Sequence, residues 1–466
     1  MEIKVVENAA SIEADILVVN QFEGEKTSND LANKYAVDED NFKGKFGETY
    51  LLHTLGNELY RKILIIGFGK KEEFCPNKLR EAVAKAVKKA MQMEAKKVAF
   101  VFDGVDFDFS EQFTMGLYIA DYKFDKYKSD KKDNHVQEVY IKADEEKIKK
   151  AEKIATAMAF ARNLSNEPAQ FATPNELANI AQDFGLETKI YDKEECEKMG
   201  MGAFLAVGQG SINEPKFIHM KYSCDNPKKR IAIIGKGICF DSGGLDIKPA
   251  SSMITMKDDM SGAACVLGVM SIIKEFNPQV EVHGIIAACE NMPSGKAYKP
   301  GDIVTAKNGK TIEIDNTDAE GRLTLADALC YACELGVDEV IDLATLTGAC
   351  MVALGTHASG IMGNDEELIH NLIDTAKRNG EKFWELPLWD EYFDSLKSDI
   401  ADMKNSGSRW GGASAAGVFL KKFVKDVKWA HIDIAGTAFL DKPQKEFISG
   451  ATGAGVRTLL NYILEQ

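Results

Sequence analysis

Two acidic residues lie two positions apart in residues 316–323, and a glycine and an arginine follow them. In an extended segment, Asp318 and Glu320 would point to the same side. Gly321 would let the backbone turn or approach a ligand closely. The Arg322 guanidinium would offer planar donors to a carboxylate or a carbonate. Most Asp-x-Glu pairs are solvated loop charges, so this segment alone leaves that alternative open.

A second cluster lies upstream, at residues 231–249. The apolar run 231–234 predicts a buried strand of a parallel sheet. Lys236 follows this run and would lie at a strand end, where open α/β sheets bind ligands. Asp241 comes shortly after it. A simple ion pair between Lys236 and Asp241 is the alternative to a chemical role.

Two further acids, Asp258 and Asp259, precede an apolar helix predicted at residues 265–276. An acid at a helix N-terminus commonly caps the helix. We expect one of the two to cap this helix and the other to take part in chemistry.

Together the clusters supply four carboxylates, which would balance the charge of two divalent cations: Asp241, Asp259, Asp318 and Glu320. Oxygen ligands without histidine suit Mn²⁺, Mg²⁺ or Zn²⁺, and a carboxylate can bridge two ions. A lysine can join such a site only after its amine loses a proton, which nearby cations favour.

These motifs resemble the signature of the leucyl aminopeptidase (cytosol aminopeptidase) family, a two-metal type. The resemblance covers roughly residues 155–466, and over residues 1–150 only the general pattern is similar. It rests on residues 235–244, 248–249, 256–260 and 316–323, with further blocks at 162–169, 293–302, 342–349 and 433–437.

The resemblance implies a metal-dependent exopeptidase with two Mn²⁺ or Zn²⁺ ions in each subunit. The implied ligands of one ion are Lys236, Asp241, Asp259 and Glu320. Those of the other are Asp241, Asp318 and Glu320. Asp241 and Glu320 would bridge the pair, and residue type alone does not distinguish Mn²⁺ from Zn²⁺.

The resemblance also implies a mechanism in which a metal-bridging water attacks the peptide carbonyl. Lys248 would be the electrophile beside that carbonyl, and Arg322 would hold a bicarbonate ion as the general base. The substrates would be peptides with a free N-terminus, with leucine and other large apolar residues preferred. The implied substrate-binding residues, each of which could instead be ordinary core packing, are Met256, Thr345, Leu346, Gly348, Ala435 and Ala438.

The chain has 466 residues, enough for two domains with their own cores. We expect an α/β protein with a smaller N-terminal α/β domain at 1–150, a linking helix at 151–166, and a catalytic domain at 167–466. Buried strands are predicted at 14–19, 62–67 and 97–102, with an amphipathic helix at 77–93. In the larger domain, a mostly parallel central sheet is predicted from strands at 231–234, 282–288, 339–344 and 429–434.

The chain carries 57 basic and 72 acidic residues, a net charge of −15, which disfavours nonspecific binding to nucleic acid. No apolar run predicts a membrane span, and the first residues lack a secretory signal pattern. Nine cysteines in mostly apolar segments indicate reduced thiols and hence a cytoplasmic protein. The resemblance implies a homohexamer. A two-metal phosphoesterase and a DNA-binding protein are the competing functions.

Overall fold

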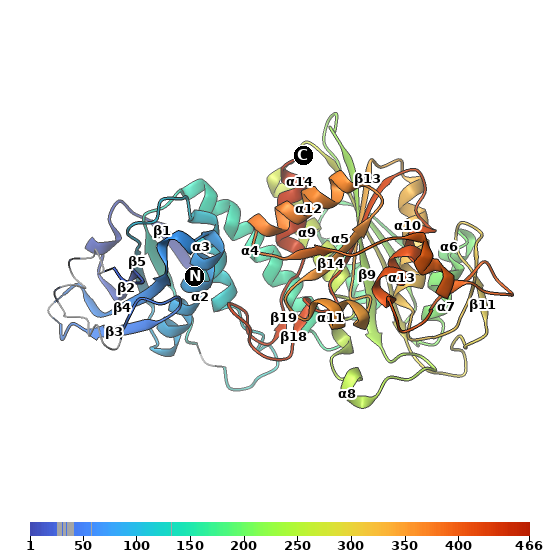
Figure 1. The fold of residues 1–466 in the computed structure, drawn as a ribbon, viewed down its shortest axis with the longest axis horizontal. Coiled ribbons are helices and arrows are strands. Elements are labelled where there is room, and N and C mark those ends of the chain that lie inside the picture. The colour runs from blue at the N-terminus through green and yellow to red at the C-terminus, as the bar shows by residue number, and fades with distance from the viewer. Residues whose placement is uncertain (26–29, 31–33, 35–41, 57, 132) are drawn as a thin grey trace. The chain divides into compact units, whose positions relative to one another are not determined.

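The computed structural model describes residues 1–25, 30, 34, 42–56, 58–131 and 133–466. The chain divides into two compact units (Figure 1). The N-terminal unit consists of Met1–Thr156 and Lys442–Ile448, and the C-terminal unit of Ala157–Asp441 and Ser449–Gln466. The division falls within helix α4 (Glu145–Asn166), where the sequence predicts a linking helix.

The N-terminal unit is built on a six-stranded sheet, blue in Figure 1. Its strands pair in parallel except for β3 with β4. In sheet order they are β1 (Glu2–Val5), β6 (Glu138–Ile141), β5 (Lys97–Val101), β2 (Ala14–Phe22), β4 (Tyr60–Gly69) and β3 (Thr49–His53). The three predicted strands lie in β2, β4 and β5.

The predicted amphipathic helix of this unit is α2 (Pro76–Gln92), which packs beside α3 (Ser110–Asp121). Proline at the first position of α2 fits the helix start, because no backbone donor is needed there. The apolar face of α2, with Leu79, Val83 and Val87, is buried in the core of the unit. Strands β4 and β5 lie on either side of β2, so the connection from β4 through α2 to β5 crosses over one strand.

The C-terminal unit contains an eight-stranded sheet. In sheet order its strands are β15 (Phe383–Glu385), β14 (Ser359–Gly363), β17 (Lys428–Asp433), β13 (Glu339–Ala344), β9 (Arg230–Asp241), β10 (Glu281–Asn291), β8 (Lys216–Tyr222) and β7 (Glu187–Tyr191). The four central strands, β17, β13, β9 and β10, pair in parallel and overlap the four predicted strands, and β9 and β10 extend beyond the predicted ranges. The predicted α/β fold with a mostly parallel central sheet is confirmed.

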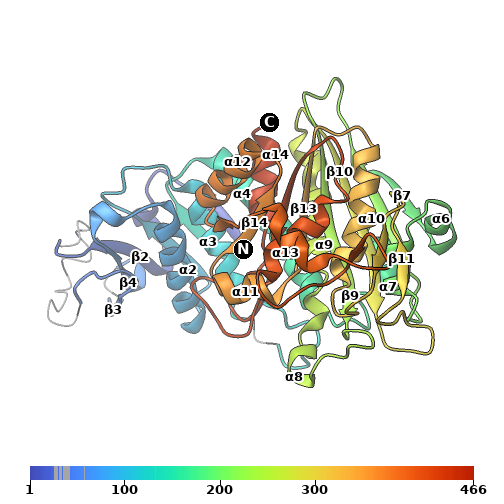
Figure 2. The ribbon, with the colours of Figure 1, turned by 45° about the vertical axis from the view of Figure 1, so that its right-hand side comes forward.

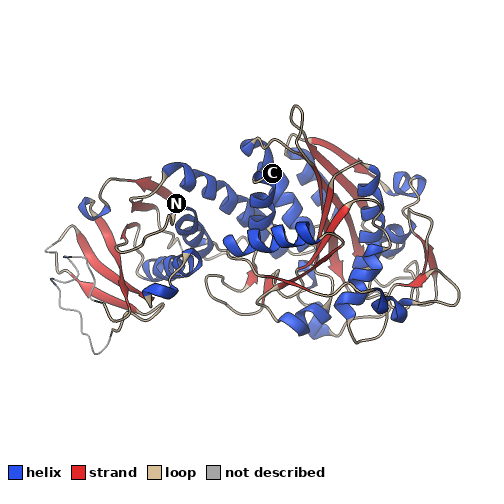
Figure 3. Cartoon of the chain, turned by 45° about the horizontal axis from the view of Figure 1, so that its top comes forward, coloured by secondary structure: helices blue, strands red, loops and turns tan. Residues whose placement is uncertain are grey.

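Helices cover both faces of this sheet, as Figure 3 shows by colour. Helix α9 (Ser261–Phe276) and helix α10 (Gly321–Glu334) each pack against β9, β10 and β13. They lie on opposite faces. Gly235 approaches the backbone of α9, whereas its neighbour Ile234 lies in the core that contains Leu323 and Leu329 of α10. Figure 2 labels these strands and helices from a second side.

The remaining helices surround this layered core. They are α5 (Pro174–Asp183), α6 (Lys193–Lys198), α7 (Gly202–Gly208), α8 (Ala250–Met253), α11 (Gly348–Leu354), α12 (Glu366–Arg378), α13 (Gly412–Lys421) and α14 (Val456–Leu464). A small sheet joins β11 (Ile303–Thr305), β12 (Thr311–Glu313) and β16 (Met403–Lys404), and β18 (Phe439–Leu440) pairs with β19 (Gly450–Ala451). Within the described part of the chain, no helix has both the length and the apolarity to cross a bilayer.

Candidate metal centre

The carboxyl ends of the central strands bring the predicted chemical residues together. Lys236 lies on β9 and is almost fully buried. Its Nζ atom is 2.8 Å from Asp259 Oδ1 and 2.9 Å from Glu320 Oε1, and it donates a hydrogen bond to the carbonyl oxygen of Thr345 at 2.9 Å. The simple ion pair with Asp241, considered as the alternative, is therefore not the pairing that the structure has.

Asp241, at the end of β9, pairs instead with Lys248. The Nζ atom of Lys248 is 2.8 Å from Asp241 Oδ2 and 2.6 Å from Asp318 Oδ1. The other oxygen of Asp241 accepts hydrogen bonds from the Asn291 side chain at 2.8 Å and from the Gly243 N–H at 2.9 Å. Both oxygens of Asp241 are thus held in place.

Asp259 and Glu320 approach from helix starts. Asp259 precedes α9, and Glu320 is the residue before the first turn of α10. The expectation that Asp258 or Asp259 caps α9 is wrong, because Met260 occupies the cap position and no side chain caps the helix. The Asp259 carboxylate turns toward Lys236, and the Thr345 hydroxyl donates to it at 2.7 Å.

The segment that carries Asp318 and Glu320 is not extended. Thr317 and Asp318 form a turn, and α10 begins at Gly321. The two carboxylates nevertheless reach the same cluster, because Lys248 contacts Asp318 and Lys236 contacts Glu320. The missing side chain at Gly321 leaves room for the lysine, since a Cβ atom there would lie 2.5 Å from Lys236 Cε.

The donor set fits a divalent cation. One carboxylate oxygen from each of Asp241, Asp259 and Glu320 lies within 4.8 Å of the others, and all three residues are buried. One oxygen of Asp259, Oδ2, and one of Glu320, Oε2, are buried and lack a hydrogen-bond partner. Buried, unpaired carboxylate oxygens are costly unless a cation neutralises them. Oxygen ligands are those that Mn²⁺ and Mg²⁺ prefer.

Burial and crowding perturb the titration of the cluster. Burial and the nearby Glu320 charge raise the pKa of Asp241 to about 6, although Lys248 opposes the change. Burial raises the pKa of Asp259 well above its ordinary value, although Lys236 opposes this shift. For Lys236, burial favours the neutral amine, but the surrounding carboxylates outweigh it and raise its pKa. Such clusters of perturbed groups are typical of functional sites.

Arg322 lies in the first turn of α10, one residue after Gly321, and is buried. Its Nη1 atom donates to the carbonyl oxygen of Asn405 at 2.8 Å, whereas its Nε atom has no hydrogen-bond partner. Burial lowers the pKa of the guanidinium to about 10, opposed by the charges of Glu320 and Asp433. The group still carries its charge at neutral pH.

The predicted substrate-binding residues are placed unequally. Thr345 contacts Asp259, and Leu346 and Ala435 both donate their N–H groups to Asp433, at 3.2 and 3.1 Å. The remaining three make no hydrogen bond to the carboxylates of the cluster. Met256 lies in the 3₁₀ turn Met256–Asp258, Gly348 begins α11 beside open space, and Ala438 is buried in the core.

Several supporting residues escaped the sequence analysis. Asn291 ends β10 beside Asp241 and donates both to that carboxylate and to the Thr317 carbonyl. Tyr298 donates to the same carbonyl at 2.7 Å. A polar residue just after a predicted strand was the signal that could have identified Asn291, and Tyr298 lies in the block 293–302 that carries part of the resemblance.

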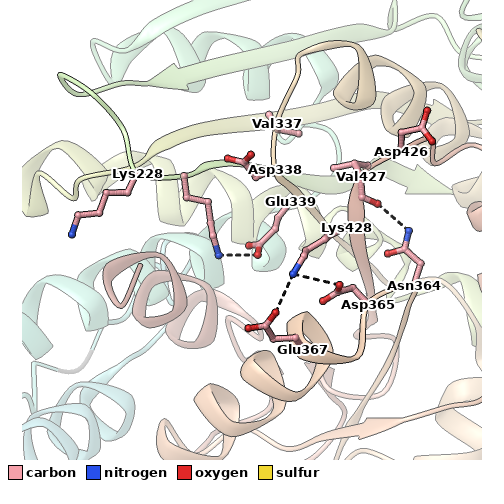
Figure 4. A pocket seen from close by; sticks show the side chains of 11 residues that line it. Lys228, Val337, Asp338, Glu339, Asn364, Asp365, Glu367, Asp426, Val427 and Lys428 are labelled. Carbon is pink, nitrogen blue, oxygen red and sulfur yellow. Dashed lines mark hydrogen bonds and ion pairs between the residues drawn. The ribbon is translucent and has the colours of Figure 1, made fainter.

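Two other polar features of the C-terminal unit are a buried histidine and a charged hollow. His431 is fully buried and pairs with Asp342 at 2.6 Å. A hollow of about 770 Å³ lies at the opposite ends of β9, β13 and β17 (Figure 4). Two ion pairs line it, one between Lys229 and Glu339 and one between Lys428 and Glu367.

Comparison with known proteins identifies the family of this chain. The pattern of the cytosol aminopeptidase family, catalytic domain, matches residues 159–460, and that of its N-terminal domain matches residues 7–131. Probable cytosol aminopeptidases of Persephonella marina and Aquifex aeolicus are each 46% identical, over 92% and 93% of this chain and 90% of each relative. One from Alkaliphilus oremlandii is 43% identical over 99% of both chains.

The fold is also that of a solved enzyme. The bottromycin maturation enzyme BotP in complex with Mn is 31% identical, with a TM-score of 0.88 over 97% of this chain and 99% of BotP. A second BotP structure is 29% identical, with a TM-score of 0.87 over the same shares of the two chains. This chain belongs to the cytosol aminopeptidase family and is a metal-dependent aminopeptidase.

Proposed function

We propose that this aminopeptidase binds two divalent ions, Mn²⁺ or Zn²⁺, and prefers peptides that begin with leucine or another large apolar residue. One ion would be held by Lys236, Asp241, Asp259 and Glu320, and the other by Asp241, Asp318 and Glu320. The observation that carries the proposal is the meeting of three buried carboxylates around Lys236, two of them with an unpartnered oxygen.

Bound divalent ions lower the pKa of water and polarise a carbonyl group, which is the chemistry that peptide hydrolysis needs. The chain's own residues would prepare the cluster for this. Lys236 would give up the proton that now pairs it with Asp259 and Glu320. The Asn291 amide, which donates to Asp241 at 2.8 Å, would keep that carboxylate oriented.

Lys248 would be the electrophile. Its ammonium lies between Asp241 and Asp318. Burial would lower the pKa of Lys248, but these carboxylates outweigh burial and raise it, so the group stays charged. A fixed positive charge there would offset the negative charge that develops on the carbonyl oxygen of the substrate.

Arg322 would hold a bicarbonate ion that serves as the general base. Its planar donors suit such an anion. The unpartnered Nε atom and the permanent positive charge support this role. The base would accept a proton from the attacking water and return it to the leaving amine.

The preference for a large apolar first residue would come from a pocket formed by Met256, Thr345, Leu346, Gly348, Ala435 and Ala438. Gly348 supports this idea, because the space beside it is open. The small side chain of Ala438 would leave this pocket deep. Equal rates on leucine and alanine amides would count against a deep pocket.

The assembly we propose is a homohexamer in the cytoplasm. Large apolar side chains are exposed on the C-terminal unit, including Ile254, Val352 and Trp410. Exposed apolar groups of this kind often mark interfaces between subunits. The nine cysteines are free thiols, as expected in a reducing compartment. Sedimentation analysis would test the hexamer.

The proposed function is tested by hydrolysis of leucine-p-nitroanilide. Protein stripped with a chelator should be inactive, and Mn²⁺ or Zn²⁺ should restore cleavage. N-acetylated leucine-p-nitroanilide should not be cleaved, because the site needs a free amine. Folded, assembled protein that cleaves nothing with either metal would overturn the proposal, and cleavage of a phosphate ester instead would favour a two-metal phosphoesterase.

A further inference from the structure

The segment that follows β13, residues 345–347, is held by one buried carboxylate from the neighbouring strand. Asp433 ends β17 and is fully buried. Its Oδ2 atom accepts a hydrogen bond from the Thr347 hydroxyl at 2.7 Å. Its Oδ1 atom accepts from the N–H groups of Leu346 at 3.2 Å and of Ala435 at 3.1 Å. Every one of these contacts needs an acceptor, which a carboxylate supplies on both oxygens.

The same short segment touches the candidate metal centre. The carbonyl oxygen of Thr345 accepts a hydrogen bond from Lys236 at 2.9 Å, and its hydroxyl donates to Asp259 at 2.7 Å. Thr345 is adjacent to Leu346, the first residue that Asp433 holds. A displacement of the segment would therefore move two groups of the cluster together.

Both ends of the segment are fixed by the surrounding fold. Before it, the Ile434 N–H donates to the carbonyl oxygen of Ala344 at 2.8 Å. After it, the Thr347 hydroxyl accepts from the Cys350 N–H at 3.0 Å and caps α11. The Thr347 hydroxyl thus joins Asp433 to the start of a helix. Between these anchors, Asp433 supplies the acceptors on which the position of Leu346 and Thr347 depends.

We propose that Asp433 is a positioning residue for the metal centre. By holding Leu346 and Thr347 it sets the place of Thr345, which in turn orients Asp259 and Lys236. The inference rests on the proposed ligand set and extends it, because Asp433 is not one of the proposed ligands and would act through Leu346 and Thr347. Groups that orient metal ligands typically change metal affinity or activity by roughly 10- to 100-fold when they are removed.

The test compares Asp433→Asn and Thr347→Val with two controls. Asp433→Asn replaces one acceptor oxygen by an NH2 group, which only donates. Either the Thr347 hydroxyl or the N–H groups of Leu346 and Ala435 therefore lose their acceptor. Thr347→Ser keeps the hydroxyl and should behave as the wild type does. Glu381→Gln is the matched control, because Glu381 also accepts from a buried threonine hydroxyl, Thr458, and from the N–H groups of Gly455 and Thr458.

Three quantities are measured for each variant: Mn²⁺ affinity of the metal-free protein by calorimetry, kcat and KM on leucine-p-nitroanilide, and the unfolding temperature. Asp433→Asn and Thr347→Val should weaken Mn²⁺ binding or lower kcat by roughly 10-fold or more, with a smaller change in KM. Glu381→Gln should lower only the unfolding temperature.

Two results would overturn the inference. One is Mn²⁺ affinity and kcat within twofold of wild type in folded Asp433→Asn and Thr347→Val. The other is an equal loss in Glu381→Gln, which would make the effect one of general stability. A wild-type protein that cleaves no free-amine substrate would instead refute the proposed function, so the two failures are distinguishable.

Discussion

Gly321 and Lys236 are in contact at a distance that permits no side chain on the glycine. A Cβ atom at Gly321 would lie 2.5 Å from Lys236 Cε and 2.8 Å from Lys236 Nζ. The lysine is confined by Asp259, Glu320 and the Thr345 carbonyl, so it cannot move aside without losing partners.

The first prediction follows from this contact. Gly321→Ala should lower Mn²⁺ affinity and kcat by roughly 10-fold or more, an effect of the size found when groups around a metal site are disturbed. The free energy of unfolding should change little. Gly321 begins α10, where alanine favours the helix by about 1 kcal/mol over glycine, and this gain offsets the cost of displacing Lys236. Calorimetry with Mn²⁺, steady-state kinetics and thermal unfolding would measure the three quantities.

A matched control exists in Gly295, beside which a Cβ atom would meet no atom within 4 Å. Gly295→Ala should retain wild-type metal affinity and turnover. The prediction fails if Gly321→Ala binds Mn²⁺ and turns over as the wild type does. It also fails if both alanine variants lose activity equally.

The ends of the central strands explain what sequence could reveal about this site. Lys236 and Asp241 both follow the apolar run 231–234, so the strand and the two polar residues after it could be predicted together. Asn291 could not be tied to Asp241, because their contact depends on the register of β9 with β10. Register is set by packing across the sheet, which no local pattern records.

Asp259 shows why a local rule can mislead. Its position before α9 favours helix capping, yet its carboxylate contacts Lys236 and the Thr345 hydroxyl instead. Asp433 shows the complementary failure, because it is 87 residues from Leu346 in the sequence and the strand order alone brings them together. Tertiary contacts decide both cases, and they outweigh the preferences of short segments.

Glu320 carries the second prediction. Glu320→Ala should remove a carboxylate shared by both proposed ions, so activity should fall by more than roughly 100-fold, the upper range for residues that only support ligands. A ligand that binds only the folded state raises the free energy of unfolding, by about 2.7 kcal/mol when its free concentration is 100 times its Kd. Mn²⁺ should therefore raise the unfolding temperature of the wild type but not of Glu320→Ala. Turnover near the wild-type level in the variant would refute the ligand assignment.

Lys248 is the subject of the third prediction. Lys248→Ala removes a charge that lies 2.8 Å from Asp241 and 2.6 Å from Asp318 without removing a proposed ligand. We expect kcat to fall by roughly 100- to 1,000-fold, as for other losses of a group that stabilises a developing oxyanion. Bound Mn²⁺, counted by elemental analysis, should stay at the wild-type level. Metal loss in this variant would show that Lys248 supports the ions rather than the substrate.

The fourth prediction concerns acid stability and a different part of the C-terminal unit. His219 of β8 is buried and hydrogen-bonded to His283 at 2.8 Å and to the Tyr331 hydroxyl at 2.9 Å. Burial and the nearby His283 lower the pKa of His219 to about 4. Its other charged neighbours are Lys189, Lys221 and Glu281, of which only Glu281 favours the protonated form.

Because the folded pKa of His219 is below that of the unfolded chain, only the unfolded state takes up this proton between about pH 6.5 and pH 4. Acid should therefore destabilise the fold across that window. His219 alone should lower the free energy of unfolding by about 2 kcal/mol at pH 5 relative to pH 7.5. Burial raises the pKa of Glu281, but its hydrogen-bond partners outweigh burial and lower that pKa to about 2. Its contribution to the stability of the fold is therefore lost only at more acid pH. Urea unfolding at pH 7.5 and pH 5 would measure the change in wild type and His219→Gln. His219→Gln has no imidazole at this position to titrate, so its free energy of unfolding should fall by about 2 kcal/mol less than that of the wild type between pH 7.5 and pH 5. An equal fall in the wild type and the variant would contradict the prediction.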